Sequence, residues 1–292
     1  MAASGDLSAP VRIFVAATAD EWLPTRVLEF SLRETTALPV EVRLIESFGR
    51  ALPRPEHKRN QPRTPFSFQR FLIPELCQYQ GRAIYLDADM QVFADIAALW
   101  CHPMDGHDLL AVHEGGDRRP GQFSVMLLDC ERLRWRVDDI VRGLDEGSYT
   151  YEELMYGMCV AASVGRTIAA GWNSLERYDP DTTRLLHYTD MNQQPWVAAT
   201  NPLAPVWIAC LRRAMAGGFI QREELAREVT AGHVRPSLIA QIDAGVDDPA
   251  ALRGAIRDLD RAFVAPYRRL AGYRWRRWAS LRGLVGALLR RL

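Results

Sequence analysis

Apolar runs alternate with amphipathic stretches through the first half of the chain. Val11–Ala17 is a run rich in β-branched and aromatic residues, which predicts a buried strand. Residues 24–35 carry apolar side chains at helical spacing, and Pro24 suits the first turn of a helix. Val40–Ile45 alternates apolar and polar side chains, as a half-buried strand does. The order strand, helix, strand predicts an α/β fold with parallel strands.

The pattern continues with further strands and helices, while Gly49–Thr64 is a long Arg- and Pro-rich loop of the kind that is usually functional or mobile. Asp95 is expected to cap a short helix that runs to Trp100. From Val206 onward the pattern is mostly helical, so we expect an α/β domain over residues 1–200 and a helical region over residues 201–292. The other expected strands are Ala83–Asp89, Leu109–Val112, Phe123–Leu128, Ile168–Trp172 and Leu185–Tyr188, and the other expected helices are Phe66–Gln78, Glu131–Leu144 and Tyr151–Ala162.

The charge is balanced overall but unevenly distributed. The 36 basic and 36 acidic side chains give a formal net charge of zero, which argues against a generic nucleic-acid binder. Nine of the basic side chains and none of the acidic ones lie between Arg261 and Leu292. The rest of the chain is therefore acidic and the tail is basic.

Cysteine usage and hydropathy bear on the compartment. The five cysteines are scattered without CxxC spacing, which predicts neither a zinc site nor a disulfide framework. The first ten residues lack the apolar core of a signal peptide, and there is no run of about 18 apolar residues that would span a membrane. We therefore expect a protein of the reducing cytoplasm.

Two carboxylates, Asp87 and Asp89, stand at the end of the apolar run that begins at Ala83. Side chains at i and i+2 of a strand share one face, so the two carboxylates are expected to project together. Two such charges repel each other, and a divalent cation such as Mg²⁺ or Mn²⁺ removes that conflict while bridging to phosphates. The pair predicts a metal–diphosphate site beyond a strand's carboxyl end, where ligands of open α/β sheets bind. A solvated strand end is the alternative, since Asp is common in turns.

The order of motifs around this pair resembles a glycosyltransferase of the GT-A fold, near glycosyltransferase family 8. The resemblance extends from Arg12 to Trp196, and the acidic pair alone would be weak support for it. The motifs that carry it are Arg12–Ala17 with Leu28–Arg33, Phe66–Leu76 ahead of Tyr85–Asp89, Gln122–Asp129, Gly171–Leu175, Leu186–Thr189, and Pro195-Trp196.

This resemblance implies a mixed sheet flanked by helices, with a nucleotide-sugar-binding catalytic domain and a helical C-terminal extension. It implies a sugar transfer from a nucleotide sugar, with a UDP-sugar as the expected donor, Mn²⁺ or Mg²⁺ as the cofactor, and retention of the anomeric configuration. Asp87, Asp89 and His187 match the family's metal ligands. A histidine satisfied inside the core is the alternative for His187.

The resemblance also implies a donor site. Arg70 matches a helix arginine that lines it, with a surface ion pair as the alternative. Ala88 lies between the two carboxylates. Ala16, Ala17 and Thr18 match the strand end where the nucleoside rests, with ordinary strand packing as the alternative.

Several positions depart from the family pattern. Gln122 and Ser124 stand where the third motif normally has Asn and Gly, although the Gln122 amide can still form hydrogen bonds at the reacting centre. Glu152 or Glu153 could serve near the reacting sugar, or could belong to a solvated helix face. Gln194 replaces the Lys that binds the donor diphosphate, so one cationic contact is missing unless another arginine supplies it.

The tail from Tyr267 to Leu292 combines eight arginines with tyrosine and tryptophan, followed by leucines at helical spacing. This composition is typical of a helix that lies on an anionic membrane surface. It predicts peripheral attachment to the inner face of the membrane and a cell-envelope or lipid-linked glycan acceptor. A helix packed on the acidic part of the chain, or on a partner chain, is the alternative.

Two other functions remain open. A nucleotidyltransferase also uses acidic pairs, but it would need a Gly-rich basic loop after the first strand, where this chain has the acidic turn Ala17–Glu21. The departures at Gln122, Ser124 and Gln194 keep a noncatalytic nucleotide-sugar-binding or glycan-binding protein in view. A phosphatase with an Asp nucleophile would carry its acidic pair on the first strand, which is not the case here.

Overall fold

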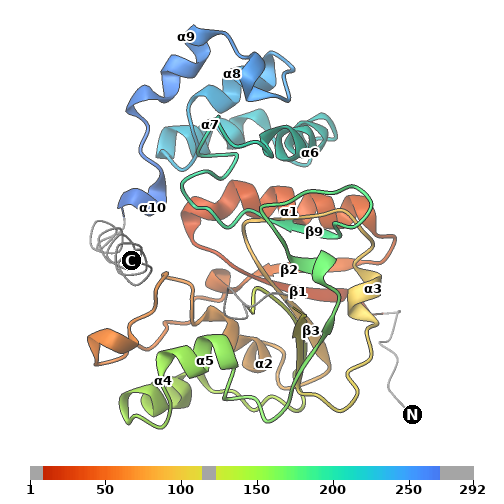
Figure 1. Ribbon diagram of the computed structural model, residues 1–292, viewed down its shortest axis with the longest axis vertical. Helices are drawn as coiled ribbons and strands as arrows, with labels where there is room; N and C mark the ends of the chain where they lie inside the picture. Colours follow the sequence, from red (N-terminus) through yellow and green to blue (C-terminus); the bar gives the residue numbers. More distant parts are fainter. Residues whose placement is uncertain (1–8, 114–122, 270–292) are drawn as a thin grey trace, which may run out of the picture. The chain divides into compact units, whose positions relative to one another are not determined.

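The computed structural model describes residues 9–113 and 123–269, and the chain divides into two compact units, Met1–Thr189 and Asp190–Leu292 (Figure 1). The first unit holds every strand of the described residues and the second holds helices. The mixed α/β architecture with a helical C-terminal extension confirms the predicted fold class. The domain boundary expected near residue 200 stays a prediction.

A six-stranded mixed sheet forms the centre of the first unit, in the order β2-β1-β3-β6-β5-β7. β1 pairs in parallel with β2 and β3, whereas β6 runs antiparallel to both β3 and β5, and β7 is parallel to β5. The carboxyl ends of β1, β3, β5 and β7 therefore lie at one edge of the sheet. The strands are β1 Val11–Ala16, β2 Val40–Leu44, β3 Arg82–Asp87, β5 Leu109–Val112, β6 Val125–Asp129 and β7 Val164–Ile168.

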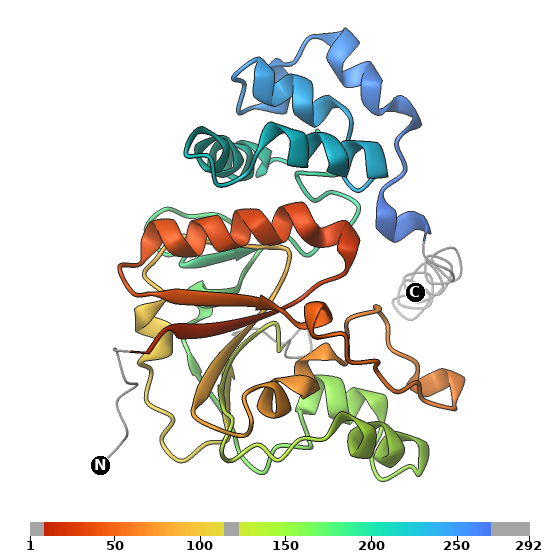
Figure 2. The same cartoon turned by 180° about the vertical axis from the view of Figure 1, so that it is seen from behind.

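Alternation along the central strands supplies a core on each face of this sheet. Val11, Ile13 and Val15 are fully buried with Leu28 and Leu32 of α1 (Trp22–Thr35), which runs beside β1 and β2 (Figure 2). Burying a side chain of this size contributes about 1.5–3 kcal/mol. The period-two pattern of β1 thus places the helix on this face.

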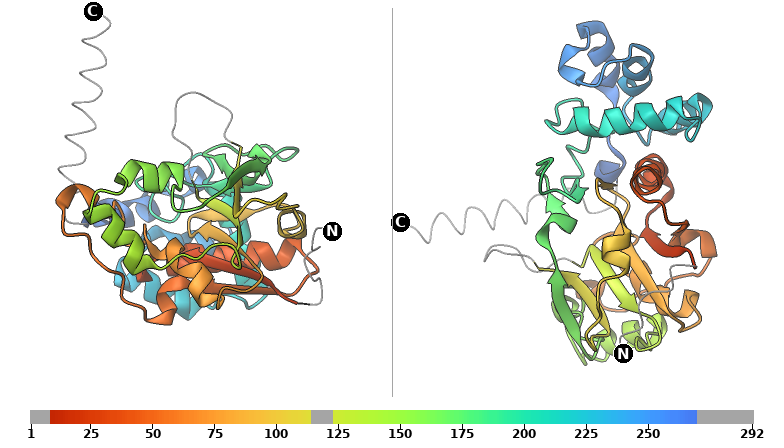
Figure 3. Two further views of the ribbon diagram at one scale, coloured as in Figure 1. Left: turned by 90° about the horizontal axis from the view of Figure 1, so that it is seen from below. Right: turned by 90° about the vertical axis from the view of Figure 1, so that its right-hand side faces the viewer.

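Phe14 and Tyr85 point to the opposite face, into a core formed with the apolar stripes of α4 (Val137–Asp145) and α5 (Tyr151–Gly157). Figure 3 shows these two helices side by side. Helix α2 (Ile73–Leu76) packs into the same core through Ile73. A short helix, α3 (Ala97–Trp100), follows Asp95, whose carboxylate accepts from the Ala97 N–H at 2.8 Å.

A second sheet of three strands lies in the same unit, in the order β4-β9-β8. These strands are β4 Met90–Val92, β8 Ser174–Leu175 and β9 Leu185–His187. Met90 pairs with His187 in an antiparallel ladder. The buried Ser31 hydroxyl of α1 accepts a hydrogen bond from the Val92 N–H at 3.0 Å, which ties β4 to the helix above the large sheet.

The prediction that Asp87 and Asp89 project together from the end of one strand was wrong in a way that matters for the site. β3 ends at Asp87, the chain bends at Ala88 and Asp89, and β4 then joins the other sheet. Both strands are buried, so the apolar run continues across the bend and conceals it. The two carboxylates consequently do not share a face of one strand.

Other boundaries also differ from the expectation. The helix expected at Phe66–Gln78 is a 3₁₀ turn, Gln69–Leu72, followed by the short α2, because Pro74 cannot donate a backbone hydrogen bond. The strand expected at Ile168–Trp172 is the end of β7 followed by a 3₁₀ turn over Ala170–Asn173.

The helix expected at Glu131–Leu144 begins later, at Val137. The helix expected at Tyr151–Ala162 ends at Gly157, since Met158 adopts a left-handed conformation with φ of 51°.

The Arg- and Pro-rich segment 49–64 lies along α4. Arg50 pairs with Asp138 at 2.7 Å near the start of that helix. At its end, Asp145 accepts from the backbone N–H groups of Glu56, at 2.9 Å, and His57, at 3.4 Å. The Asn60 amide donates to Asp145 and to the Leu144 carbonyl. The segment is therefore held in place by α4 rather than by its own apolar pattern.

The second unit is built of helices around a buried arginine. The Arg235 side chain donates to the Pro195 carbonyl at 3.1 Å and to the side chains of Ser237 and Gln241. Burial lowers the pKa of Arg235 to about 10, which leaves it charged. In the described part of the chain no helix has the length and hydropathy needed to cross a membrane. The helices are α6 Ala204–Ala216, α7 Arg222–Ala231, α8 Ser237–Asp243, α9 Gly254–Arg257 and α10 Pro266–Arg269.

Candidate metal and donor site

Asp87, Asp89 and His187 lie together at the carboxyl end of β3. One ligand atom from each side chain falls within 4.8 Å of the others. His187 Nε2 is 3.0 Å from Asp89 Oδ1 and 3.9 Å from Asp87 Oδ2. Asp87 ends a strand of the large sheet and His187 ends β9 of the small sheet, so the bend at Asp89 joins the two sheets at this point.

Asp87 is held by two neighbours. The Tyr85 hydroxyl donates a hydrogen bond to its Oδ1, and Arg70 Nη2 lies 3.7 Å from the same oxygen. Arg70 is only 7% exposed, stacks over the Tyr85 ring at 4.7 Å, and donates from Nη1 to the Phe123 carbonyl at 3.0 Å. Burial raises the pKa of Tyr85 well above its ordinary value despite the nearby Arg70 charge, so the phenol stays protonated as a donor. Arg70 is thus a buried part of the site, and the surface ion pair considered above is not what the structure shows.

His187 is oriented by Asn173. Its Nδ1 lies 2.9 Å from Asn173 Oδ1, and because an amide oxygen only accepts, Nδ1 carries the proton and Nε2 faces the carboxylates. Burial lowers the pKa of His187, but the charge of Asp89 and its hydrogen bond more than offset that effect, so the pKa is raised overall. Asn173 belongs to the Trp172-Asn173 motif, but its partner was not predicted.

The turn after β1 closes the other side of the site. Ala16 is the register partner of Asp87, and the Ala17 backbone exchanges hydrogen bonds with the Gln69 amide at 3.2 and 3.1 Å. The Thr18 N–H donates to Glu21 Oε2 at 2.9 Å. Burial, followed by the charge of Asp89, raises the pKa of Glu21 well above its ordinary value. Glu21 was not predicted as a site residue, although the acidity of this turn is visible in the sequence.

The donor set suits a divalent cation. Two carboxylates and one imidazole supply the oxygen and nitrogen ligation that Mn²⁺ accepts, and Mg²⁺ is compatible through the carboxylates. Two buried N–H donors beside the cluster, Arg70 Nε and Asn173 Nδ2, have no hydrogen-bond partner among the described residues. An unsatisfied buried donor costs about 1–3 kcal/mol, so a polar ligand at this place would relieve it. The residues present therefore fit a metal ion with an oxygen-rich ligand.

The remaining predicted residues lie in different places. Ala88 is buried between the two carboxylates, and Thr18 follows Ala17 at the edge of the cluster. Gln122 lies outside the described residues. Gln194 belongs to the second unit, where it is buried and its N–H donates to the Asp190 carbonyl at 3.0 Å. The structure thus brings the β1 and β3 positions together with His187.

Glu152 and Glu153 lie on the first turn of α5 and not in the metal cluster. Glu153 forms a capping box with Thr150, accepting from its N–H at 2.7 Å while the Thr150 hydroxyl accepts from the Glu153 N–H at 3.1 Å. Glu152 is 62% exposed and pairs with Arg63 at 2.8 Å. Arg63 also lies over the rings of Tyr151 and Tyr156. A catalytic role for either glutamate stays a prediction.

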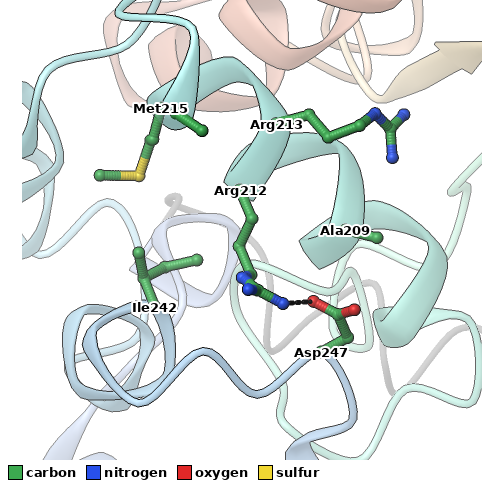
Figure 4. Close-up of a pocket in the computed structure, with 7 residues that line it drawn as sticks. Ala209, Arg212, Arg213, Met215, Ile242 and Asp247 are labelled. Atoms are coloured by element: carbon green, nitrogen blue, oxygen red, sulfur yellow. Dashed lines mark hydrogen bonds and ion pairs between the residues drawn. The ribbon is translucent and has the colours of Figure 1, made fainter.

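A separate pocket of about 600 Å³ lies within the second unit, between α6 and the segment around α8 (Figure 4). Its polar feature is an ion pair of 2.7 Å between Arg212 and Asp247. None of the predicted site residues lines it.

Sequence comparison places part of the chain near known glycosyltransferases. The family model described as glycosyl transferase family 8 matches residues 27–163, which include Arg70, Asp87 and Asp89. "Protein CDI" of Arabidopsis thaliana is 39% identical over 92 residues, which make up 31% of this chain and 36% of that protein. "Glycosyltransferase GlyB" of Streptococcus pneumoniae is 33% identical over 92 residues, 31% of this chain and 22% of that protein. The matches thus span well under two thirds of these relatives.

Solved structures extend the likeness at the level of the fold. The WbbM bifunctional glycosyltransferase superposes with a TM-score of 0.52 at 12% identity, over 69% of this chain and 49% of that one. The glycosyltransferase GlyE of Streptococcus pneumoniae gives a TM-score of 0.50 at 16% identity, over 69% of this chain and 60% of that one. At such identities the likeness shows the fold alone. The chain therefore has the GT-A fold, and over residues 27–163 it resembles glycosyltransferase family 8, which supports a glycosyltransferase.

Proposed function

We propose that this protein is a metal-dependent glycosyltransferase that moves a sugar from a nucleotide-sugar donor, a UDP-sugar, to a glycan acceptor. The observation that carries the proposal is the cluster of Asp87, Asp89 and His187 at the carboxyl edge of the large sheet, with two of its three members inside the family-matched segment. Asp87 and Asp89 would hold Mn²⁺ or Mg²⁺ together with His187 Nε2. When bound, the ion would supply Lewis-acid stabilisation of charge on a departing nucleoside diphosphate.

The chain's own residues would prepare the donor site. Arg70 and the Tyr85 hydroxyl fix the orientation of Asp87, and Asn173 fixes the tautomer of His187. A nucleoside is proposed to rest at the end of β1, at Ala16, Ala17 and Thr18, of which the two alanines are fully buried. Each of these groups is held before a ligand arrives, which lowers the cost of binding.

Gln122 and either Glu152 or Glu153 are the proposed groups near the reacting sugar, with retention of configuration, and Gln194 is proposed to contact the donor. For Glu152 to act, its ion pair with Arg63 would have to open, or the substrate would have to bind next to both side chains.

We further propose a cytoplasmic protein attached to the inner face of the membrane by its basic tail, with a cell-envelope or lipid-linked glycan as acceptor. Most of that tail, residues 270–292, lies outside the described residues. The support is therefore its composition: arginines interleaved with tryptophans and leucines.

The turn after β1 weighs against the alternative of a nucleotidyltransferase. The half-buried Glu21 lies there within electrostatic reach of Asp89, whereas a triphosphate would require cationic side chains or a Gly-rich backbone at this turn. A noncatalytic nucleotide-sugar-binding or glycan-binding protein is the second candidate, since Glu153 is engaged in helix capping and Glu152 in an ion pair.

A donor screen tests the proposal. UDP-, GDP- and other activated sugars would be titrated with and without Mn²⁺ while binding and diphosphate release are measured. We expect Mn²⁺-dependent binding and release with a UDP-sugar, and loss of the Mn²⁺-dependent part in Asp89→Asn. Binding without release would favour the noncatalytic alternative. Absence of binding by any nucleotide sugar, or wild-type Mn²⁺ dependence in Asp89→Asn, would refute the transferase or the metal assignment respectively.

A further inference from the structure

Strand β7 contains a bulge close to the edge that carries the metal cluster. Leu110 of β5 pairs with Gly165 and Val112 pairs with Ile168, so Ala111 alone faces both Arg166 and Thr167. Bulges re-aim side chains and occur often beside active sites. Gly165 comes directly before the bulge. A Cβ atom at this position would lie 2.5 Å from the Leu110 side chain, so β7 approaches β5 too closely here for a larger residue.

The half-buried Arg166 guanidinium at this bulge stacks over the ring of Phe123, with its Cζ 4.8 Å from the ring centroid. Phe123 is only 1% exposed, and its carbonyl accepts the hydrogen bond from Arg70 Nη1. Arg70 in turn lies 3.7 Å from Asp87. Two residues therefore separate Arg166 from the metal cluster, and the ring of Phe123 holds its guanidinium in one place.

The charge of Arg166 is not neutralised within the described residues. No carboxylate there forms an ion pair with it, and no hydrogen bond from its guanidinium is present in that part of the chain. A half-buried guanidinium that forms no ion pair among these residues keeps its N–H groups available to an oxyanion that arrives from solvent. Arginine is the side chain best suited to hold phosphate or carboxylate oxygens through two N–H groups.

We propose that Arg166 binds an oxyanion of the substrate, a phosphate or carboxylate oxygen, and so determines which substrates this site accepts. The inference rests on the proposed transferase function. The oxyanion belongs either to the donor's diphosphate or to an acidic sugar of the acceptor. Either source uses the same chemistry: an arginine fork stacked on an aromatic ring, near the same edge of the sheet as the metal cluster.

Calorimetric titration of the full-length protein tests this inference with four probes. Mn²⁺ alone reports the metal cluster, and Mn²⁺ with pyrophosphate or UDP reports the diphosphate. Glucuronate, with glucose as its neutral match, is titrated into the protein saturated with UDP and Mn²⁺ and reports an acidic acceptor. The variants are Arg166→Gln and Arg166→Lys, with Arg33→Gln as the control that removes one exposed arginine from α1 on the other face of the sheet.

We expect Arg166→Gln to lower the affinity for one class of probe by about tenfold or more, the usual effect of losing a charged hydrogen bond. That class is either pyrophosphate together with UDP, or glucuronate. Arg166→Lys should recover part of that affinity, while Mn²⁺ alone and the Arg33→Gln control stay at wild-type values. Loss of pyrophosphate and UDP affinity identifies the donor as the source, and selective loss of glucuronate identifies the acceptor.

Two results overturn the inference. One is that Arg166→Gln binds every probe with wild-type affinity. The other is that the variant loses affinity for Mn²⁺ but for no other probe, which would show that Arg166 acts only by supporting Phe123 and Arg70. If the wild-type protein binds pyrophosphate through Arg166 but no nucleotide or nucleotide sugar, the transferase function fails and the oxyanion site stands. If the wild-type protein binds none of the probes, both fail.

Discussion

At the scale of single residues, the site depends on side chains that would not touch the metal. Asn173 fixes the proton of His187 on Nδ1, and Tyr85 and Arg70 share one oxygen of Asp87. Such supporting groups are needed because two carboxylates and an imidazole can otherwise adopt several rotamers that do not converge. The acidic pair and His187 could be predicted from the sequence, whereas these supports depend on contacts that only the fold creates.

Asn173→Ala tests the support of His187. The variant removes the acceptor of the Nδ1 proton, so the imidazole can rotate or change tautomer. We expect Mn²⁺ affinity to fall about 10–100-fold, as for other residues that orient a metal ligand. Titration of Mn²⁺ into wild type and variant measures it, and the metal-free melting temperatures show whether the variant stays folded. An unchanged Mn²⁺ affinity in a folded variant contradicts the role given to Asn173.

At the scale of elements, the sequence predicts best where one pattern governs a whole segment. The strands at Val11 and Leu109 and the helix from Trp22 follow a single period, and the structure places them within a few residues of the prediction. The bend at Ala88 could not be predicted, because β3 and β4 are both buried and the hydropathy is the same on each side of it. The bulge at Arg166 could not be predicted either, because it is set by the pairing of β7 with β5, and strand pairing cannot be read from a single sequence.

The Arg- and Pro-rich segment 49–64 gives an element-scale prediction. Asp145 holds it by accepting backbone hydrogen bonds from Glu56 and His57, and the Glu56 N–H is the main reason that the pKa of Asp145 is lowered. In Asp145→Ala we expect limited trypsin digestion to cut within the segment, at sites such as Lys58 and Arg59, several times faster than in wild type.

The same contact has a pH dependence with a defined sign. Because the pKa of Asp145 is lowered in the folded protein, its stabilising effect is fully present above the carboxyl group's ordinary pKa. The effect is lost as pH falls through the lowered value. Amide hydrogen exchange at Glu56, corrected for its intrinsic pH dependence, should lose protection over that acidic range in wild type and show little pH-dependent change in Asp145→Ala. Equal protection in the two proteins at neutral pH would contradict the anchoring role.

At the scale of the whole molecule, charge is segregated along the chain. Nine arginines and no acids follow Asp260, and the rest of the chain carries 27 basic and 36 acidic side chains. Near an anionic bilayer each basic side chain contributes about 1 kcal/mol, so the eight arginines after Tyr267 are enough for attachment to the surface. The acidic remainder would be repelled from the same surface, which favours contact through the tail.

Liposome flotation tests this attachment. The full-length protein should float with vesicles that contain phosphatidylserine and stay at the bottom with purely neutral vesicles. A truncation before Tyr267 should lose flotation, and raising the salt concentration should weaken it in the full-length protein through screening. Equal flotation of the two proteins would rule out the tail as the attachment site.

The bend between β3 and β4 has a thermodynamic consequence for the first unit. Asp87 ends a strand of the large sheet and His187 ends a strand of the small one, so a cation bound by both would link the two sheets. Ligand occupancy and docking of the small sheet would then be coupled: at a concentration of 100 times Kd, binding would add about 2.7 kcal/mol to the stability of the docked state. Amide exchange at Met90, which follows Asp89 and pairs with His187, would slow on cation binding, so the rate at that position would report occupancy of the site.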